Sequence, residues 1–354
     1  MTKVISGIQQ IGIGIPNVHE AWDWYNRNFG FDLPMFDEAA EAGLMLPYTD
    51  GKPQQRHAIL ALNLKGGGGF EIWQYTSRIP QPADFELQIG DLGIFITKVK
   101  TSDIDVAYRQ LAQNKTNLLS EIVKMPDGTA HFFVQDPYGN TFQIVPSNEW
   151  FRPSIDSVFG GAYGAIIGVT NMKKSMEFYK KILGYDTVIS DQEAIFDDFK
   201  NIPGGQHKIR RVLLKHSQPR QGAFSKLLGP STIELVKVID RIPQKIFKDR
   251  LWGDLGFIHL CFDIRNMQDL KEECESLGHP FTVDSADSFD MGEAAGHFAY
   301  IEDPDGALIE FVETHKIPIA KKFGLYKNLK KRNPTKPLPD WMLGVLRFNR
   351  VKKS

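Results

Sequence analysis

The sequence predicts an α+β protein built from four modules, each with one strand, one helix and three further strands. Residues 10–32 align without a gap to residues 164–186, so the chain contains a duplication. A second related pair, 131–145 and 297–312, carries Asp-Pro-Tyr-Gly or Asp-Pro-Asp-Gly between two alternating strands. A strand followed at once by a helical pattern precedes each of these hairpins. Four βαβββ units in two tandem pairs account for all three observations.

The first and third modules open in the same way. Each has a short strand, an Asn at the helix N-cap (Asn17 or Asn171), an apolar stripe with helical period, and a Gly that ends the helix (Gly30 or Gly184). Strands are then predicted near 31–36, 57–64 and 70–76 in the first module, and near 185–190, 207–216 and 231–239 in the third.

The second and fourth modules begin at LGIFIT (92–97) and GFIHLCFDI (256–264), and helices are predicted over 103–113 and 267–277. In GFIHLCFDI the side chains of His259, Cys261 and Asp263 share one face, because successive residues of a strand point to opposite sides. Asn266 is the expected N-cap of the helix that follows, and Gly278 its C-terminal stop.

The composition is that of a globular protein, with 354 residues, 42% of them hydrophobic, and a net charge of −1. No apolar run approaches the roughly 20 residues that span a bilayer, and the first ten residues lack a signal pattern. Two cysteines are too few for a disulfide framework. The glycine-rich segments 66–69 and 203–205 join strands and start no helix, so dinucleotide binding is unsupported. We expect a cytoplasmic protein, a monomer or homodimer, with no membrane partner.

Residues 315–354 form a basic C-terminal extension, with twelve Lys or Arg residues and one acid, Asp340. Such a segment could bind nucleic acid. However, Trp341, Leu343 and Phe348 interrupt its charges, and prolines divide it. We therefore expect it to dock on the acidic remainder of the chain or on a partner subunit, and we expect no nucleic-acid partner.

The four modules, the strand–Asn–helix–Tyr–Gly pattern and the Asp-Pro-Asp-Gly hairpin followed by Glu310 resemble the vicinal oxygen chelate superfamily. This superfamily includes glyoxalase I, extradiol and 4-hydroxyphenylpyruvate dioxygenases, and bleomycin-resistance proteins. The resemblance covers residues 7 to about 314 and implies two glyoxalase-like domains, 1–150 and 151–314. Each would be a curled mixed sheet forming a cup, with helices outside and metal ligands inside, drawn from the first and last strand of each module.

Strand periodicity places three potential ligands of the C-terminal half on inward faces: Glu234, His259 and Glu310. Gly164 fills the fourth position and leaves room for water or substrate. Two carboxylates and an imidazole suit one divalent metal ion, Zn, Mn, Fe, Co or Ni. The sequence therefore predicts a metal site at these three residues.

The N-terminal half presents Gln10, Glu71, Gly93 and Gln143 at the equivalent positions, a set that binds a transition metal poorly. We expect its metal site to be lost and its cup to be filled by Trp73.

Other polar residues are expected to have lesser roles. Asp263 and Glu313 are predicted to lie in solvent, and four histidines, His57, His131, His207 and His297, are predicted to be structural or to line a pocket rim. The insertion 216–230 is a candidate lid. Basic residues near it are candidates for holding an anionic substrate: Arg210, Arg211, Lys215 and Arg220.

The resemblance implies three functions. The first is a metal-dependent isomerase, epimerase or lyase acting on a small substrate with vicinal oxygens through an enediolate, with Glu234 and Glu310 catalytic and Glu234 as the mobile base. The second is a dioxygenase, which Gly164 disfavours because such enzymes use two histidines and one carboxylate. The third is a metal-free binding protein of the bleomycin-resistance type.

Overall fold

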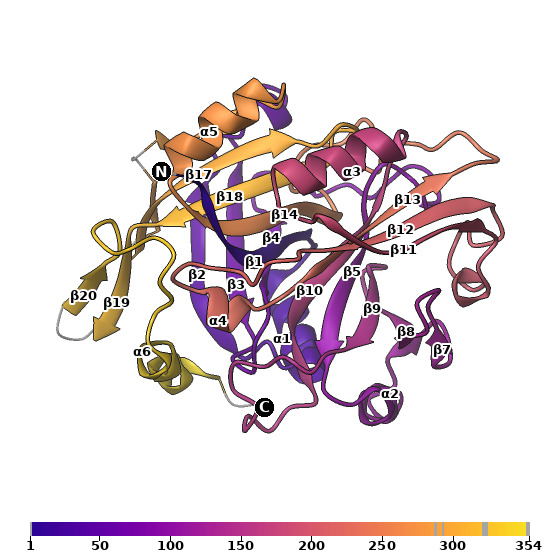
Figure 1. Ribbon diagram of the computed structural model, residues 1–354, viewed down its shortest axis with the longest axis horizontal. Coiled ribbons are helices and arrows are strands. Elements are labelled where there is room, and N and C mark those ends of the chain that lie inside the picture. The colour runs from indigo at the N-terminus through magenta and orange to yellow at the C-terminus, as the bar shows by residue number, and fades with distance from the viewer. Residues whose placement is uncertain (1, 287–288, 292–293, 321–324, 352–354) are drawn as a thin grey trace.

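The computed structural model describes residues 2–286, 289–291, 294–320 and 325–351, and its strands form two large curled sheets (Figure 1). Helices α3 and α5 cover one side of the molecule, and α1 and α2 cover the opposite side. The predicted α+β class, with four βαβββ modules and curled mixed sheets, is confirmed.

The first and third modules contain the elements that the repeat predicts. The first module comprises β1 Val4–Gly14, α1 Val18–Phe29, β2 Leu33–Glu41, a 3-10 turn Leu46–Tyr48, β3 Gln55–Leu62 and β4 Gly69–Tyr75. The third comprises β10 Phe159–Gly168, α3 Met172–Lys181, β11 Thr187–Ala194, a 3-10 turn Asp197–Phe199, β12 Ile209–Lys215, α4 Ser225–Leu228 and β13 Thr232–Val238. Asn17 and Asn171 cap their helices as expected, each accepting hydrogen bonds from backbone N–H groups of the first turn.

The second and fourth modules end in the predicted hairpins. The second comprises β5 Gly93–Thr101, α2 Ile104–Gln113, β6 Asn117–Leu118, β7 Val123–Lys124, β8 Ala130–Gln135 and β9 Thr141–Pro146. The fourth comprises β14 Gly256–Arg265, α5 Met267–Ser276, β15 Val283–Asp284, β16 Phe289–Met291, β17 Ala294–Glu302 and β18 Leu308–Thr314. The extension adds β19 Lys316–Ala320, β20 Leu325–Asn328, α6 Asp340–Gly344 and a 3-10 turn Val345–Asn349.

The modules that share a sheet are not the ones expected from the sequence. One sheet has the order β15-β17-β18-β14-β1-β4-β3-β2 and so joins the fourth module to the first. The other has the order β11-β12-β13-β10-β5-β9-β8-β6 and joins the third to the second. The antiparallel pairs β1–β14 and β5–β10 make these joins. Each cup therefore combines modules from both halves of the sequence, and the boundaries at residues 150 and 314 stay predictions.

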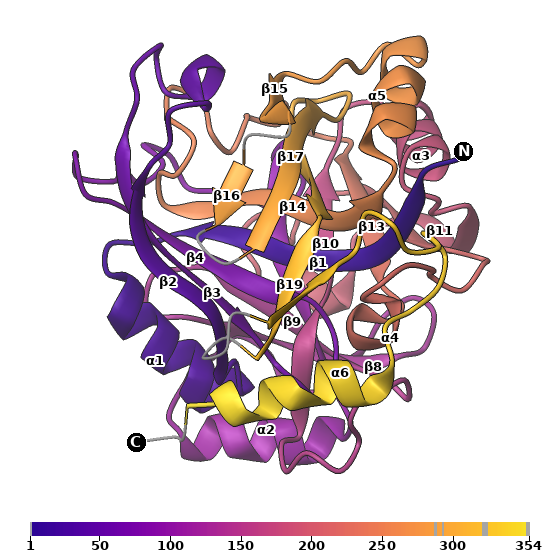
Figure 2. The ribbon, with the colours of Figure 1, turned by 90° about the vertical axis from the view of Figure 1, so that its left-hand side faces the viewer.

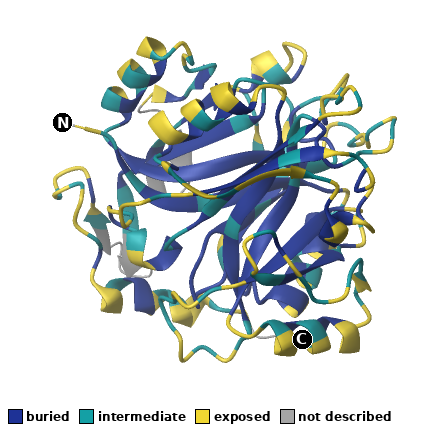
Figure 3. Cartoon of the chain, turned by 45° about the vertical axis from the view of Figure 1, so that its right-hand side comes forward, coloured by how far each residue is buried: buried dark blue, intermediate teal, exposed yellow. Residues whose placement is uncertain are grey.

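Consecutive modules are linked by their helices. The Tyr25 hydroxyl on α1 donates to Asp136 Oδ2 in the second module, at 2.6 Å, and the Tyr179 hydroxyl on α3 donates to Asp303 Oδ2 in the fourth, at 3.0 Å. All four side chains are buried in the core, which lies on the helix-covered faces of the sheets, while the outer helix faces are exposed (Figure 3).

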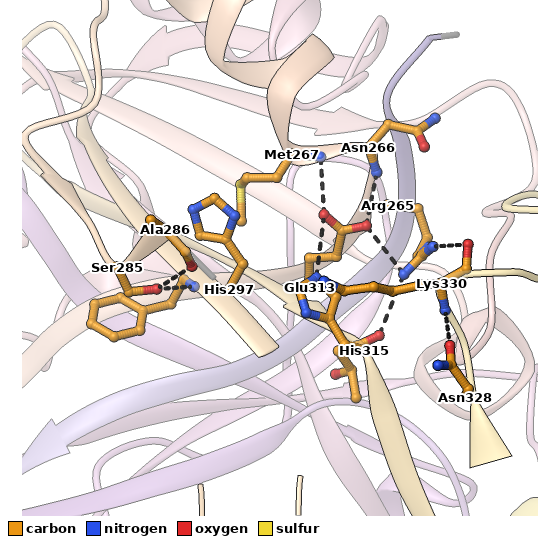
Figure 4. A network of polar contacts seen from close by, with 12 residues as sticks. Arg265, Asn266, Met267, Ser285, Ala286, His297, Glu313, His315, Asn328 and Lys330 are labelled. Carbon is orange, nitrogen blue, oxygen red and sulfur yellow. Dashed lines mark hydrogen bonds and ion pairs between the residues drawn. The ribbon is translucent and has the colours of Figure 1, made fainter. Parts of the chain in front are cut away.

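The start of α5 departs from the predicted capping. Asn266 has φ 67° and its side chain makes no cap hydrogen bond; Glu313 on β18 accepts instead from the backbone N–H groups of Asn266 and Met267, at 3.2 and 3.1 Å (Figure 4). Glu313 also pairs with Arg265 at 3.1 Å and is buried, so the prediction that it lies in solvent is corrected. A carboxylate at a helix N-terminus satisfies N–H groups that have no partner within the helix.

The described part of the C-terminal extension is docked on the chain. Arg350 makes a two-pronged ion pair with Asp32, with a shortest distance of 2.6 Å, and Lys226 Nζ lies 2.7 Å from Asp340 Oδ1. Leu338 and Leu343 pack into an apolar cluster with side chains of β2, β3 and α4. Figure 2 shows α6 near α4, across the ends of the strands of the first sheet. Four basic residues of the extension, Lys321, Lys322, Lys352 and Lys353, lie outside the described residues.

Among the described helices, none combines the length and the apolar character needed to cross a bilayer.

Candidate metal centre

Four adjacent strands of the first sheet, β18, β14, β1 and β4, each contribute one polar side chain to the concave face: Glu310, His259, Gln10 and Glu71. Gly12 is the register partner of His259 on one side and of Glu71 on the other. A Cβ atom at Gly12 would lie 2.4 Å from the His259 ring, so glycine at this position makes room for the imidazole. A β-bulge between Ile8 and Gln10 adjusts the register of β1 beside the cluster.

The four side chains converge closely. His259 Nε2 lies 3.1 Å from Glu310 Oε2 and 3.3 Å from Glu71 Oε2. The Gln10 amide donates to Glu71 Oε2 at 3.0 Å and to Glu310 Oε2 at 3.3 Å. His259 is fully buried, while the side chains of Glu71 and Glu310 are 13% and 9% exposed. The two carboxylates are therefore the part of the cluster that solvent or a substrate reaches.

The electrostatics of the cluster favour a cation. Burial by itself lowers the pKa of His259, but the charges of Glu310 and Glu71 outweigh that effect and raise the pKa to about 9. The Tyr300 hydroxyl lies 3.5 Å from His259 Nδ1, on the side of the ring away from the carboxylates. A proton on the imidazole compensates part of the negative charge when no other cation is bound.

The cluster also fits a metal ion by a geometric test. His259 Nε2 is buried and close to both carboxylates, yet it makes no hydrogen bond of acceptable geometry to either one. The ligand atoms of Glu71, His259 and Glu310 all lie within 4.8 Å of one another. Since amide oxygen and nitrogen are interchangeable by a flip, Gln10 can present its oxygen to a cation. Three oxygen donors and one nitrogen donor match the preferences of borderline divalent metals.

Glu234 does not join this cluster, which corrects the predicted grouping of Glu234 with His259 and Glu310. It lies in the other sheet, where both of its carboxylate oxygens are held, one by Lys98 Nζ and one by Arg211 Nε. Burial alone would raise its pKa, but Arg211 and Lys98 lower it to about 2. The physical reason is that the first module, not the third, shares a sheet with His259 and Glu310. Glu71 lies opposite Gly12 in the first module, and Glu234 has the equivalent position, opposite Ile166, in the third.

The second cup is filled by a network of buried polar groups. Arg211 Nη1 also donates to Asp198 Oδ2 at 2.6 Å, and that carboxylate lies 3.1 Å from His131 Nε2. Gln143 is 2.9 Å from the other ring nitrogen of His131. The strand register places Ile96, not Gly93, at the position that His259 has in the first sheet. Without an imidazole there, and with two carboxylates neutralised by Lys98 and Arg211, this cup does not offer the donors of the first.

One cavity adjoins the cluster, and a second lies nearby. The first, of about 270 Å³, is lined by Glu71 and Glu310 together with aromatic side chains and the segment between β2 and β3. Trp73, which was expected to fill a cup, is one of these aromatic residues and is packed against Trp252. The other cavity, of about 150 Å³, is apolar and lies beyond Leu60, the register partner of Glu71. Its walls include Leu227 of the 216–230 insertion and Leu343 of the C-terminal extension.

The remaining candidates are placed away from the cluster. Arg210 pairs with Asp191, Arg211 belongs to the second cup, and Arg220 donates to the Leu183 carbonyl and stacks on Tyr185. The expected role of these arginines in holding a substrate at the cluster is therefore not supported. Asp263 is buried, not solvated as predicted, and burial raises its pKa to about 7. Three of the histidines lie next to a carboxylate outside the cluster: His57 by Asp37 at 2.6 Å, His207 by Asp240 at 3.0 Å, and His297 by Asp284 at 2.6 Å.

Sequence reasoning places His259 and Glu310 together, as the structure does, but it assigns Glu71 and Gln10 to the other cup, which was expected to lack a metal. Both are predicted to lie on inward faces, so the strand period finds the right positions. The sequence does not show which modules pair through their first strands to form one sheet.

Comparisons with known proteins agree with this architecture. A model of the family described as Glyoxalase/Bleomycin resistance protein/Dioxygenase superfamily matches residues 7–144 and 162–311. Glyoxalase I from Zea mays aligns at 12% identity over 88% of this chain and 92% of its own, with a TM-score of 0.53. A protein from Bacillus subtilis named as a candidate dioxygenase aligns at 14% identity over 88% of this chain and 86% of its own, with a TM-score of 0.54. At these identities the two structures support the fold alone. A search of curated proteins found no matching relative.

Proposed function

Because the chain belongs to the Glyoxalase/Bleomycin resistance protein/Dioxygenase superfamily, we propose that it is a metal-dependent isomerase, epimerase or lyase. Its substrate would be a small molecule with two vicinal oxygens. The observation that carries the proposal is the convergence of Gln10, Glu71, His259 and Glu310 on one concave face. In this proposal Glu71 has the role expected of Glu234, because the two residues occupy equivalent register positions in the first and third modules.

The four side chains would hold one divalent ion, Zn, Mn, Fe, Co or Ni. Such an ion would supply Lewis-acid stabilisation to negative charge that develops on the vicinal oxygens of the substrate. The protein supplies the rest of the chemistry. Trp73, Trp252 and Tyr300 line the cavity at the carboxylates and give a bound molecule an apolar wall.

We assign proton transfer to Glu71, with Glu310 as the second catalytic carboxylate. Both line the 270 Å³ cavity, so either is placed to take the proton from the hydroxyl-bearing carbon next to the substrate's carbonyl. Glu71 is the more exposed of the two carboxylates, so a molecule in the cavity has easier access to it. The fully buried His259 would serve only as a ligand.

The donor set disfavours the alternative of an oxygenase. Non-haem iron oxygenases use two histidines and one carboxylate. This cluster has one histidine and two carboxylates. Oxygen uptake by the iron(II)-loaded protein with a catechol or an aromatic keto acid would favour the oxygenase over proton transfer.

The first experiment measures metal content and metal-dependent thermal stability of the untagged protein with each of the five metals. Wild type should retain about one equivalent at this cluster, and His259→Ala and Glu310→Ala should lose it. His207→Ala, which removes a surface histidine paired with Asp240, is the matched control and should leave the metal in place. Wild-type protein that binds none of the five metals would contradict the proposal.

The second experiment follows proton exchange. With small α-hydroxycarbonyl compounds in heavy water, the metal-loaded protein should catalyse deuterium incorporation at the α-carbon, detected by NMR. Glu71→Gln should keep its metal and lose at least about 100-fold of the exchange rate, the usual size of a general-base contribution. If Glu71→Gln exchanges as fast as wild type, Glu71 is not the base.

A further inference from the structure

A second group of potential ligands lies on the outer surface of the same sheet: His19, Asp37 and His57. Their ligand atoms lie within 4.8 Å of one another. His57 Nε2 is 2.6 Å from Asp37 Oδ1, and the rings of His19 and His57 meet edge to face with centroids 5.2 Å apart. Two imidazoles and one carboxylate are donors that borderline divalent cations such as Zn²⁺ prefer.

The three side chains come from three elements whose positions are fixed relative to one another. His19 is in the first turn of α1, where Asn17 Oδ1 accepts from its backbone N–H at 3.1 Å. The neighbouring Val18 N–H donates to Gln74 Oε1 at 3.0 Å, and Gln74 is the register partner of His57 on β4. The start of α1 is therefore tied to the strand beside His57.

Asp37 is positioned by the pairing of β2 with β3. Ala39 is the register partner of His57, so Asp37 is its diagonal neighbour two residues away. Diagonal neighbours on one face of an antiparallel pair are within reach of long side chains. The ligands therefore need little rearrangement to meet around an ion, which reduces the ordering cost of binding.

The third module provides an internal comparison. The strand registers place Arg210 at the position of His57 and Asp191 at that of Asp37, and these two side chains form an ion pair at 2.7 Å. The repeat offset places Lys173 at the position of His19, so both imidazoles are missing there. The third module thus has two cations and one carboxylate where the first has two imidazoles and one carboxylate, so the metal-ligand set belongs to the first module alone.

We propose that His19, Asp37 and His57 form a second metal site that takes a borderline divalent cation such as Zn²⁺. Three protein ligands leave at least one position of a tetrahedral ion for water or a small anion. The ion would join α1 to β2 and β3 from outside the sheet whose inner face carries the first cluster. This site is independent of the function proposed above.

Zinc binding to the full-length His259→Ala protein tests the site apart from the inner cluster. After equilibrium dialysis at micromolar free Zn²⁺, this protein should hold about one equivalent, and wild type about one more. Adding His19→Ala or His57→Ala should remove that equivalent. His19→Lys, which copies Lys173, should act in the same way, whereas adding His207→Ala should change nothing.

These residues are on the surface, so the variants should keep the melting temperature of their parent in the absence of zinc. In the His259→Ala protein, zinc should raise the melting temperature only where His19, Asp37 and His57 all remain. The site is refuted if the His259→Ala protein holds no zinc, or if zinc is retained in both His19→Ala and His57→Ala. Failure of the inner cluster gives a different result, because wild type would then hold one equivalent that depends on His19 and not on His259.

Discussion

Substitution of Gly12 by Ala tests whether the inner cluster depends on the space opposite His259. The added Cβ would lie 2.4, 2.7 and 2.8 Å from Cε1, Nδ1 and Nε2 of the ring, about 1 Å inside normal contact. Gly12 does not have a positive φ, so alanine introduces no backbone strain and the effect is steric. Overpacking of this kind costs about 1–3 kcal/mol.

The displaced ring should also lower metal affinity, by roughly the 10–100-fold seen when the orientation of a ligand is disturbed. Urea denaturation of the metal-free protein measures the stability change, and metal titration monitored by thermal shift measures the affinity. The double variant Gly12→Ala/His259→Ala is the control. Removing the ring should recover most of the lost stability, which gives a coupling free energy of about 1–2 kcal/mol in a double-mutant cycle. If the stability losses of the two single variants simply add, or if Gly12→Ala binds metal like wild type, the steric argument fails.

Three further predictions concern the rest of the fold. Glu234→Gln removes the negative charge between Lys98 and Arg211 and leaves one buried positive charge uncompensated. In urea denaturation this should destabilise the protein by about 3–5 kcal/mol, and the first cup should keep its metal. Burial raises the pKa of Asp303 to about 6, so the folded state binds this proton more tightly than the unfolded state, and stability should fall as pH rises from about 4 to 6. Asp303→Asn should flatten that part of the pH profile of stability. Arg350→Ala removes the ion pair with Asp32, and limited proteolysis should then cleave the C-terminal extension faster than in wild type.

Much of the fold is predictable because its signals are local. The N-caps at Asn17 and Asn171, the glycine at the end of α1, and the alternating strands all depend on residues a few positions apart. The same strand period correctly predicts that Gln10, Glu71, His259 and Glu310 point inward.

The pairing of modules is not predictable in this way. Four similar first strands can form joined sheets in more than one combination, and residues 10–32 and 164–186 are too alike to distinguish them. The grouping of Glu234 with His259 follows from assuming that consecutive modules pair. The burial of Asp263 and Glu313 also depends on distant segments, since Ser6 lies beside Asp263, and Arg265 and the start of α5 lie beside Glu313.

The joining of the first and fourth modules has a consequence for how the chain folds during synthesis. Gln10 and Glu310 touch although they are 300 positions apart. At about 5–20 residues per second, the ribosome needs roughly 15–60 s to deliver the second after the first. For most of that interval, until β14 (Gly256–Arg265) is made, β1 exposes an unpaired edge next to an unfinished sheet, which is a template for aggregation. We therefore expect the newly made N-terminal part to rely on chaperones, and the metal cluster to be among the last parts of the protein to form.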